Sequence, residues 1–326
     1  MTYVVRLAMM PDNDSLPTTN KPTTNKPPDS HRENHLPNQP INLTSTDEHW
    51  DLIIQPKAHL LDLKLKEVWK YRDLLLLFVK RDFVAQYKQT ILGPLWHFIQ
   101  PIFTTIVFLL VFGKIANIPT DGIPPILFYM SGITMWNYFS SCLNSTSNTF
   151  VANAGIFGKV YFPRLVIPLS TVMSNLVKFG IQFLLLASEY IFYLAKGVPL
   201  HVGFSLLMVP VLVIMMAGMG LGLGIIISSL TTKYRDFTVL IGFAVQLLMY
   251  ATPVAYPLSF LQHNRFAAWI RWNPLTPIME AFRYALFQKG SFTAGSLLYS
   301  GVFIAIVLFL GLLTFSKVER TFMDTV

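Results

Sequence analysis

Charged residues are scarce in this sequence, and acidic residues are almost absent from most of it. Only 13% of the 326 residues are charged, whereas about a quarter are charged in a typical soluble domain. Hydrophobic residues make up 53%, and the mean hydropathy is +0.49. From Leu92 to the C-terminus the acidic residues are Asp121, Glu189, Asp236, Glu280, Glu319 and Asp324. This composition excludes an ordinary soluble domain and predicts an all-α integral membrane protein with a polar N-terminal region.

Cysteine pairs and nucleotide-binding motifs are also missing. The single cysteine, Cys142, excludes an internal disulfide and a cysteine-pair metal site. The sequence contains no GxxxxGK(S/T) phosphate loop, no HExxH helix and no GxSxG elbow. We therefore expect no metal and no cofactor in this chain, and no enzymatic activity of its own. If the protein uses ATP, another chain must bind ATP and Mg²⁺ and hydrolyse the nucleotide.

The N-terminal region lacks the apolar run of a secretory signal peptide. Residues 1–56 are rich in Pro, Asn and Thr, a composition that buries too little apolar surface to offset chain entropy. We predict a disordered cytoplasmic tail over 1–56, an interface-helix region over 57–92 and a transmembrane domain over 93–326.

Apolar stretches in the remaining sequence predict about six membrane-spanning helices, because a span needs about 20 mostly apolar residues. They cover residues 95–115, 126–146, 165–194, 204–228, 238–256 and 296–315.

Basic residues in the short flanks predict the orientation of these spans. A block of Lys and Arg precedes the first span, which favours a cytoplasmic N-terminus, and six crossings then return the C-terminus to the same side. The segment 257–290 disagrees, because it would face outward yet contains Arg265, Arg271, Arg283 and Lys289. Its prolines and aromatic residues predict short interfacial or re-entrant helices before the last span.

The stretch 81–91 reads RDFVAQYKQTI and predicts a helix with two unlike faces. On a helical projection, Phe83, Val84, Tyr87 and Ile91 share one arc opposite Arg81, Asp82, Lys88 and Gln89. This pattern is typical of a helix lying at the membrane surface, and Gly93 and Pro94 then supply a bend. A basic anchor ahead of a first span is the alternative.

Polar residues form a stripe on the second predicted span. On a helix, Thr134, Asn137, Ser141, Asn144, Ser145 and Asn148 fall on one face. Tyr129 and Trp136 line its edge. Hydrocarbon does not tolerate unpaired polar groups, so the stripe faces either a neighbouring helix or a hydrated conduit, and the pattern alone leaves both interpretations open.

Two further patterns concern packing and intramembrane charge. Gly218 with Gly222, and Gly220 with Gly224, are small residues four apart, a spacing that lets helices approach closely. Lys178 lies inside the third span, where a charge is a functional candidate, but its role stays open.

Several segments, in order, resemble the permease subunit of bacterial polysaccharide exporters, which are type-2 ABC transporters of O-antigen, capsule or teichoic-acid chains. They are RDFVAQYKQTILGPLWHFIQP, LLVFGKI, FYMSGITMWNYFSSCLNSTSN, GKVYFPRLVIPLS, TTKYRD, TPVAYPL and WNPLTPIMEAFRYALF. The resemblance extends from about Leu60 to the C-terminus and covers many segments in register.

The resemblance implies a homodimer in the bacterial inner membrane, two separate ATPase subunits and a lipid-linked polysaccharide as substrate. It favours the conduit interpretation, with Tyr129, Trp136, Asn137, Tyr138, Ser141 and Asn144 lining the path. It implies a cytoplasmic entrance at Arg81, Tyr87 and Lys88, where the basic groups would attract the pyrophosphate of the lipid carrier. It implies ATPase coupling by Lys159, Tyr161, Phe162 and Arg164, and an outward gate at Tyr256, Trp269 and Trp272.

Two other functions remain as alternatives. A membrane-embedded enzyme that modifies glycans would need a catalytic base, and the few acids and histidines after Leu92 offer no good constellation. Full function after replacement of His97 and Glu189 would dismiss this alternative. An ABC exporter with the same fold would also suit a drug or a lipid as cargo.

Overall fold

The computed structural model describes residues 65–88, 90–157, 162–200, 203–231, 234, 236–261 and 266–325. These residues belong to one compact unit, 60–326, and within them the structure consists of helices and their connections, without strands. The prediction of an all-α protein is confirmed for this part of the chain. The predicted tail, 1–56, lies outside the described residues.

The helical elements follow one another closely along the chain. They are α1 (Leu65–Lys70), α2 (Arg72–Tyr87), η1 (Gly93–Leu95), α3 (Trp96–Phe108), the π-helical η2 (Leu109–Ile115), α4 (Pro125–Ser147), α5 (Thr149–Phe157), α6 (Val166–Ala195), η3 (Phe204–Met208), α7 (Val209–Thr231), α8 (Phe237–Tyr250), η4 (Leu258–Leu261), α9 (Phe266–Trp272), α10 (Leu275–Phe287) and α11 (Ala294–Thr325).

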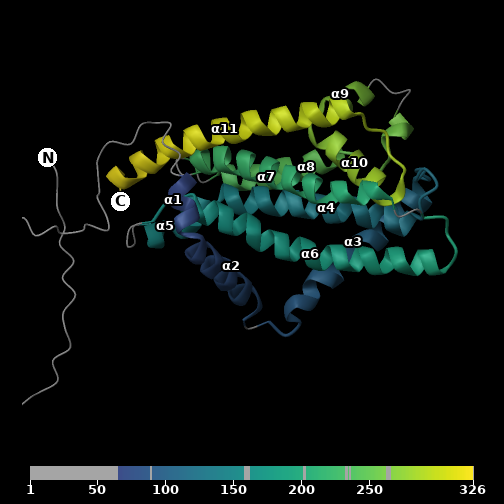
Figure 1. Ribbon diagram of the computed structural model, residues 1–326, viewed down its shortest axis with the longest axis horizontal. Helices are drawn as coiled ribbons and strands as arrows, with labels where there is room; N and C mark the ends of the chain where they lie inside the picture. The colour runs from purple at the N-terminus through teal and green to yellow at the C-terminus, as the bar shows by residue number, and fades with distance from the viewer. Residues whose placement is uncertain are drawn as a thin grey trace, which may run out of the picture. The chain divides into compact units, whose positions relative to one another are not determined.

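Four long helices form the body of the bundle, and short helices gather at its two ends. Helix α7 packs against α4 and α11, and α4 also packs against α6. Figure 1 shows α1, α5 and the C-terminal part of α11 at one end, and α9 and α10 at the other. We call these the α5 end and the α10 end. Helix α2 runs obliquely and packs on α6.

Two pairs of glycines let α7 approach a different neighbour on each side. A Cβ atom on Gly220 or Gly224 would lie 2.7 or 2.6 Å from the Cβ of Cys142 or Thr146 in α4. On the opposite face, a Cβ on Gly222 would lie 2.9 Å from Val307 of α11. The predicted close packing is therefore confirmed, and it involves two faces of α7.

Among the residues that the structure describes, four segments are long and apolar enough to cross a membrane. They are Trp96–Ile115, Val166–Ala195, Phe204–Thr231 and Ala294–Val318, in agreement with the first, third, fourth and sixth predicted spans. Helix α4 forms where the second was predicted, but it carries the polar stripe. Helix α8 has only 14 residues and ends at Tyr250, so the predicted helix over 238–256 is too long, and a turn occupies 251–256.

The predicted helix over 81–91 is wrong in its bounds. Helix α2 ends at Tyr87, and Lys88 has extended backbone angles, so Ile91 lies outside the helix and is fully exposed. Phe83, Val84 and Arg81 are all exposed, so exposure does not distinguish the two predicted arcs, and the position of this helix at the membrane surface stays a prediction. The chain bends before it reaches Gly93. The positive φ of 46° at Gly93 belongs to the start of the short η1 turn.

In the described part of the chain, the buried side chains form two clusters. The larger lies among α3, α4, α6, α7 and α10. The smaller, which we call the α5-end cluster, comprises Val68, Phe78, Phe150, Phe157, Phe162, Val166, Ile167, Ile225 and Phe315. Its members come from both ends of the sequence, so this cluster holds α1 and α2 to the ends of α7 and α11.

Candidate functional site

The polar stripe lies along the least buried face of α4. Asn137, Ser141, Asn144 and Asn148 are half-buried and Ser145 is exposed, although most of this helix is buried. The spacing of three and four residues puts these positions on one face, so the structure leaves a continuous polar face partly open along the bundle. Thr134, predicted to belong to it, is buried instead.

Two side-chain hydrogen bonds place the stripe between its neighbours. Asn137 Nδ2 donates to Gln182 Oε1 of α6 over 3.3 Å. At the other end, the Thr238 hydroxyl of α8 donates to Asn148 Oδ1 over 3.3 Å. The Asn137 and Asn148 amides at the two ends of the stripe thus bond to other helices. The hydroxyls of Ser140 and Ser147 instead donate to carbonyls within α4.

The three aromatic residues predicted to line the conduit lie in the larger buried cluster. Tyr129, Trp136 and Tyr138 are 0%, 5% and 3% exposed. The Tyr138 ring lies 5.1 Å from that of Phe179, between centroids. The prediction that rings and amides share one surface is wrong for the single chain, because α3, α6 and α7 cover the faces that carry the rings.

The predicted entrance residues lie on the exposed end of α2. Arg81 pairs with Asp82 at 2.7 Å, and its guanidinium carbon lies 4.7 Å from the centroid of the Phe78 ring. Lys88 is exposed where the helix ends. Tyr87 is part of α2, but its side chain lies outside the described atoms.

The predicted coupling loop turns its described side chains inward. Phe162 and Arg164 are both 5% exposed. The Phe162 ring lies between Phe78 of α2 and Phe157 of α5, with centroid distances of 5.8 and 6.0 Å, and the Arg164 guanidinium lies 5.3 Å from the centroid of Phe157. In the single chain, these two buried side chains are therefore not accessible for direct contact with another protein. Lys159 and Tyr161 lie outside the described residues.

The predicted gate residues lie at the α10 end in two different environments. Trp269 and Trp272 are 81% and 74% exposed on α9. Tyr256 is half-buried in the turn after α8, and its hydroxyl donates to the carbonyl of Tyr250 over 2.7 Å. The two tryptophan side chains are thus exposed at the protein surface, whereas the Tyr256 hydroxyl bonds the turn to the end of α8.

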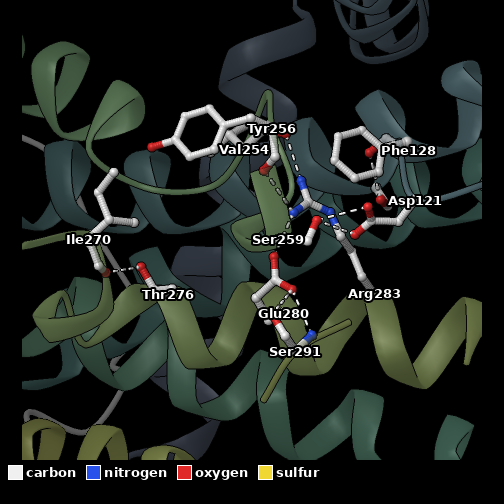
Figure 2. A network of polar contacts seen from close by, with 11 residues as sticks. Asp121, Phe128, Val254, Tyr256, Ser259, Ile270, Thr276, Glu280, Arg283 and Ser291 are labelled. Atoms are coloured by element: carbon white, nitrogen blue, oxygen red, sulfur yellow. Dashed lines mark hydrogen bonds and ion pairs between the residues drawn. The ribbon is translucent and has the colours of Figure 1, made fainter. Parts of the chain in front are cut away.

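A buried ion pair next to this turn was not predicted from the sequence. Arg283 Nη1 lies 3.1 Å from Glu280 Oε1, and both side chains are 2% exposed. Figure 2 shows this pair among Val254, Tyr256 and Phe128. The signal available in the sequence was a Glu and an Arg three residues apart in the otherwise apolar stretch 275–287, a spacing at which helical side chains meet.

Two nearby carboxylates stabilise the charged form of the buried Arg283 guanidinium. Burial lowers the pKa of Arg283, and the negative charges of Glu280 and Asp121 act in the opposite direction. Two of the basic residues that disagreed with the predicted orientation therefore have structural partners, since Lys289 Nζ also donates to the Gly122 carbonyl over 3.2 Å.

Among the residues that the structure describes, no group of three or more His, Cys, Asp or Glu is placed to hold a metal ion. The geometry offers a partly open polar face, an aromatic cluster at one end and a buried ion pair at the other.

Curated proteins with related sequences are membrane transport components. O-antigen export system permease protein RfbA of Klebsiella pneumoniae is 29% identical over 272 residues, covering 81% of this chain and 99% of the relative. The Myxococcus xanthus protein of the same name is 27% identical over 226 residues, covering 69% and 84%. Polysialic acid transport protein KpsM of Escherichia coli is 23% identical over 256 residues, covering 75% and 93%.

A family model also matches the greater part of the described chain. The model for ABC-2 type transporters covers residues 73–287, from α2 to the end of α10. This range contains the polar stripe, the coupling loop and the buried ion pair, and three of the four apolar spans. The chain is therefore a multi-pass membrane protein that belongs to the ABC-2 type transporter family.

Proposed function

We propose that this chain is the permease subunit of an ABC exporter that moves a lipid-linked polysaccharide across the bacterial inner membrane. The observation that carries the proposal is the partly open polar face of α4, which runs through a bundle of otherwise apolar helices. The names of the relatives, which are O-antigen and polysialic acid transport proteins, support a polysaccharide as cargo.

In this proposal the chain crosses the membrane six times and both termini are cytoplasmic. Helix α4 has 23 residues, which is long enough to cross a bilayer, and α8 with the following turn completes the remaining passage. The polar face of α4 then lies at the interface of two copies of the chain, where it forms the wall of a hydrated path. Amides and hydroxyls there would bond to sugar hydroxyls as the polymer slides past.

ATP hydrolysis takes place in two separate subunits, and this chain needs no bound cofactor. Those subunits would push on the loop over 158–164. Because Phe162 lies between Phe78 and Phe157, we infer that it transmits the push to α2 instead of touching the ATPase. Lys159 and Tyr161 remain the proposed contacts with that partner, and Arg81, Tyr87 and Lys88 the proposed entrance.

Replacing three polar residues of the stripe by leucine tests whether the stripe forms the wall of the conduit. The triple variant Asn137→Leu, Ser141→Leu and Asn144→Leu is expected to reduce polysaccharide at the cell surface by tenfold or more, on the order of the loss of one or two hydrogen bonds per passing sugar. Surface polysaccharide is measured in cells that lack the native gene and carry the variant.

The matched control is Ser188→Leu, the same exchange on the exposed face of α6, which should export normally. Equal amounts of both variants in the membrane exclude a folding defect. Normal export by the triple variant would sink the assignment of α4 as the conduit wall.

Gentle extraction of the tagged chain tests the subunit composition. We expect a soluble protein with a GxxxxGK(S/T) phosphate loop to co-purify in equal amount, and mass spectrometry of the preserved complex to show two copies of each. Recovery of this chain alone, under conditions that preserve other membrane complexes, would contradict the proposed exporter.

A further inference from the structure

Arg283 binds the turn that follows α8 through two backbone carbonyl groups. Its Nη2 donates to the carbonyl of Val254 over 2.7 Å, and its Nη1 donates to that of Tyr256 over 3.4 Å. Its guanidinium carbon also lies 4.0 Å from the centroid of Phe128 in α4. One side chain of α10 therefore contacts both the turn and the end of α4, as Figure 2 shows.

Glu280 extends the same contacts to the connection between α10 and α11. One carboxylate oxygen pairs with Arg283, and the other accepts the backbone N–H of Ser291 over 2.9 Å. Asp121, which precedes α4, accepts the hydroxyl of Ser259 over 2.8 Å and adds a second negative charge near Arg283. Segments far apart in the sequence thus meet at a single buried pair.

Helix α4 also approaches the turn closely at this same Val254 carbonyl group. A Cβ atom on Gly132 would lie 2.6 Å from the Val254 carbonyl oxygen and 3.2 Å from Arg283 Nη2. Glycine is thus required where α4 passes the turn, because any larger residue would push the carbonyl away from the guanidinium.

We propose that Arg283 and Glu280 are positioning residues that lock the turn 251–256 to α10 and, through the contact with Phe128, to α4, so that the turn moves only together with α10 and the helix that carries the polar stripe. This inference rests on the proposed function, because it gives the turn with Tyr256 the role of outward gate. Movement of the turn alone is unfavourable in free energy, because it would leave a buried guanidinium without its carbonyl acceptors. Joint movement of α4 and α10 during export would then open the gate without breaking those bonds.

Arg283→Lys is the decisive variant, since it keeps the positive charge beside Glu280 but cannot present a planar fork to two carbonyls. Arg283→Met is unsuitable because it leaves a buried carboxylate unpaired, which endangers folding. Gly132→Ala disturbs the same turn without changing any charge, and Gly180→Ala, whose Cβ would meet no atom within 4 Å, is its matched control.

The position of the turn is read from a cysteine at Ala255, which is 5% exposed. Full-length chain with Ala255→Cys and Cys142→Ala, in complex with its ATPase partner and reconstituted in lipid nanodiscs, is labelled with a hydrophilic maleimide. Arg283→Lys and Gly132→Ala should each raise the labelling rate about tenfold, a factor of the size expected for the loss of a hydrogen bond to a charged group. Gly180→Ala should not change it.

The native thiol serves as the reporter of global unfolding. Cys142 is fully buried in the core, so its labelling in chains without Ala255→Cys should stay slow in every variant. An unchanged rate at position 255 in both Arg283→Lys and Gly132→Ala would overturn the proposal, and so would fast labelling of Cys142 in both, because the turn would then open only with the whole fold.

Surface polysaccharide in cells separates this inference from the proposed function. Faster labelling together with reduced export is the expected result. Faster labelling with normal export would overturn the gate role of the turn and leave the exporter intact. If the unmodified chain exports no polysaccharide, the proposed function fails, while the labelling rates still report whether Arg283 holds the turn.

Discussion

Gly224→Ala is expected to lower the thermal stability of the protein, whereas Gly180→Ala should leave it unchanged or raise it. Alanine favours a helix over glycine by about 1 kcal/mol, and this gain applies at both positions. At Gly224, however, the new Cβ would lie 2.6 Å from Thr146 Cβ and 3.1 Å from the Leu143 carbonyl oxygen. Forcing atoms into a packed interface typically costs about 1–3 kcal/mol, so the net change in stability is unfavourable at Gly224 but not at Gly180.

The measurement is the temperature at which purified protein in detergent loses its monodisperse size-exclusion peak. Gly220→Ala should behave like Gly224→Ala, because it faces the same helix, and the double variant should lose more than either. If Gly224→Ala is as stable as the Gly180→Ala control, α7 and α4 do not pack as closely as the structure has them.

Phe162→Ala is expected to abolish polysaccharide export while the partner ATPase continues to hydrolyse ATP. The ring fills the space between Phe78 and Phe157, and removing a buried Phe side chain costs about 3–5 kcal/mol. The α5-end cluster would then no longer transmit movement of the loop to α2. ATP hydrolysis and export are measured on the same membranes, so that their ratio reports the coupling.

The matched control is Phe309→Ala on α11, where the ring is 50% exposed and contributes less to the packing of the chain. It should export normally. Phe162→Leu restores part of the buried volume and should recover part of the export. Parallel loss of ATP hydrolysis and export in Phe162→Ala, with loss of the bound ATPase, would instead show that this residue holds the partner directly.

The features that could be predicted from the sequence are those that depend on local composition. Long apolar runs identified four spans, because hydropathy does not depend on neighbouring helices. The stripe of α4 was also correct at Asn137, Ser141 and Asn144, since helical periodicity determines which residues share a face. The burial of Tyr129 and Trp136 was missed, because it depends on which helices cover α4.

Other features depend on contacts between distant segments and could not be read from local patterns. Phe162 looked exposed in a loop between charged residues, yet α2, about eighty positions earlier, covers it. Arg283 was noted only as a basic residue at odds with the predicted orientation, because its acceptors Val254 and Tyr256 precede it by 29 and 27 residues. The end of α8 was misplaced because residues 251–256 contain no charged residue to interrupt the stretch that begins with the helix.

The shortness of α8 has a consequence for the surrounding bilayer. Fourteen residues span about 21 Å at 1.5 Å per residue, less than a hydrocarbon core of about 30 Å. Such a mismatch is met by local thinning or by irregular backbone at membrane depth, which needs its polar groups bonded inside the protein. Asn273 binds the carbonyl of Ala251, and Arg283 binds those of Val254 and Tyr256. In the proposed six-span arrangement the turn then lies within the hydrocarbon layer with these carbonyls bonded, and the thickness of the host membrane becomes a determinant of where it sits.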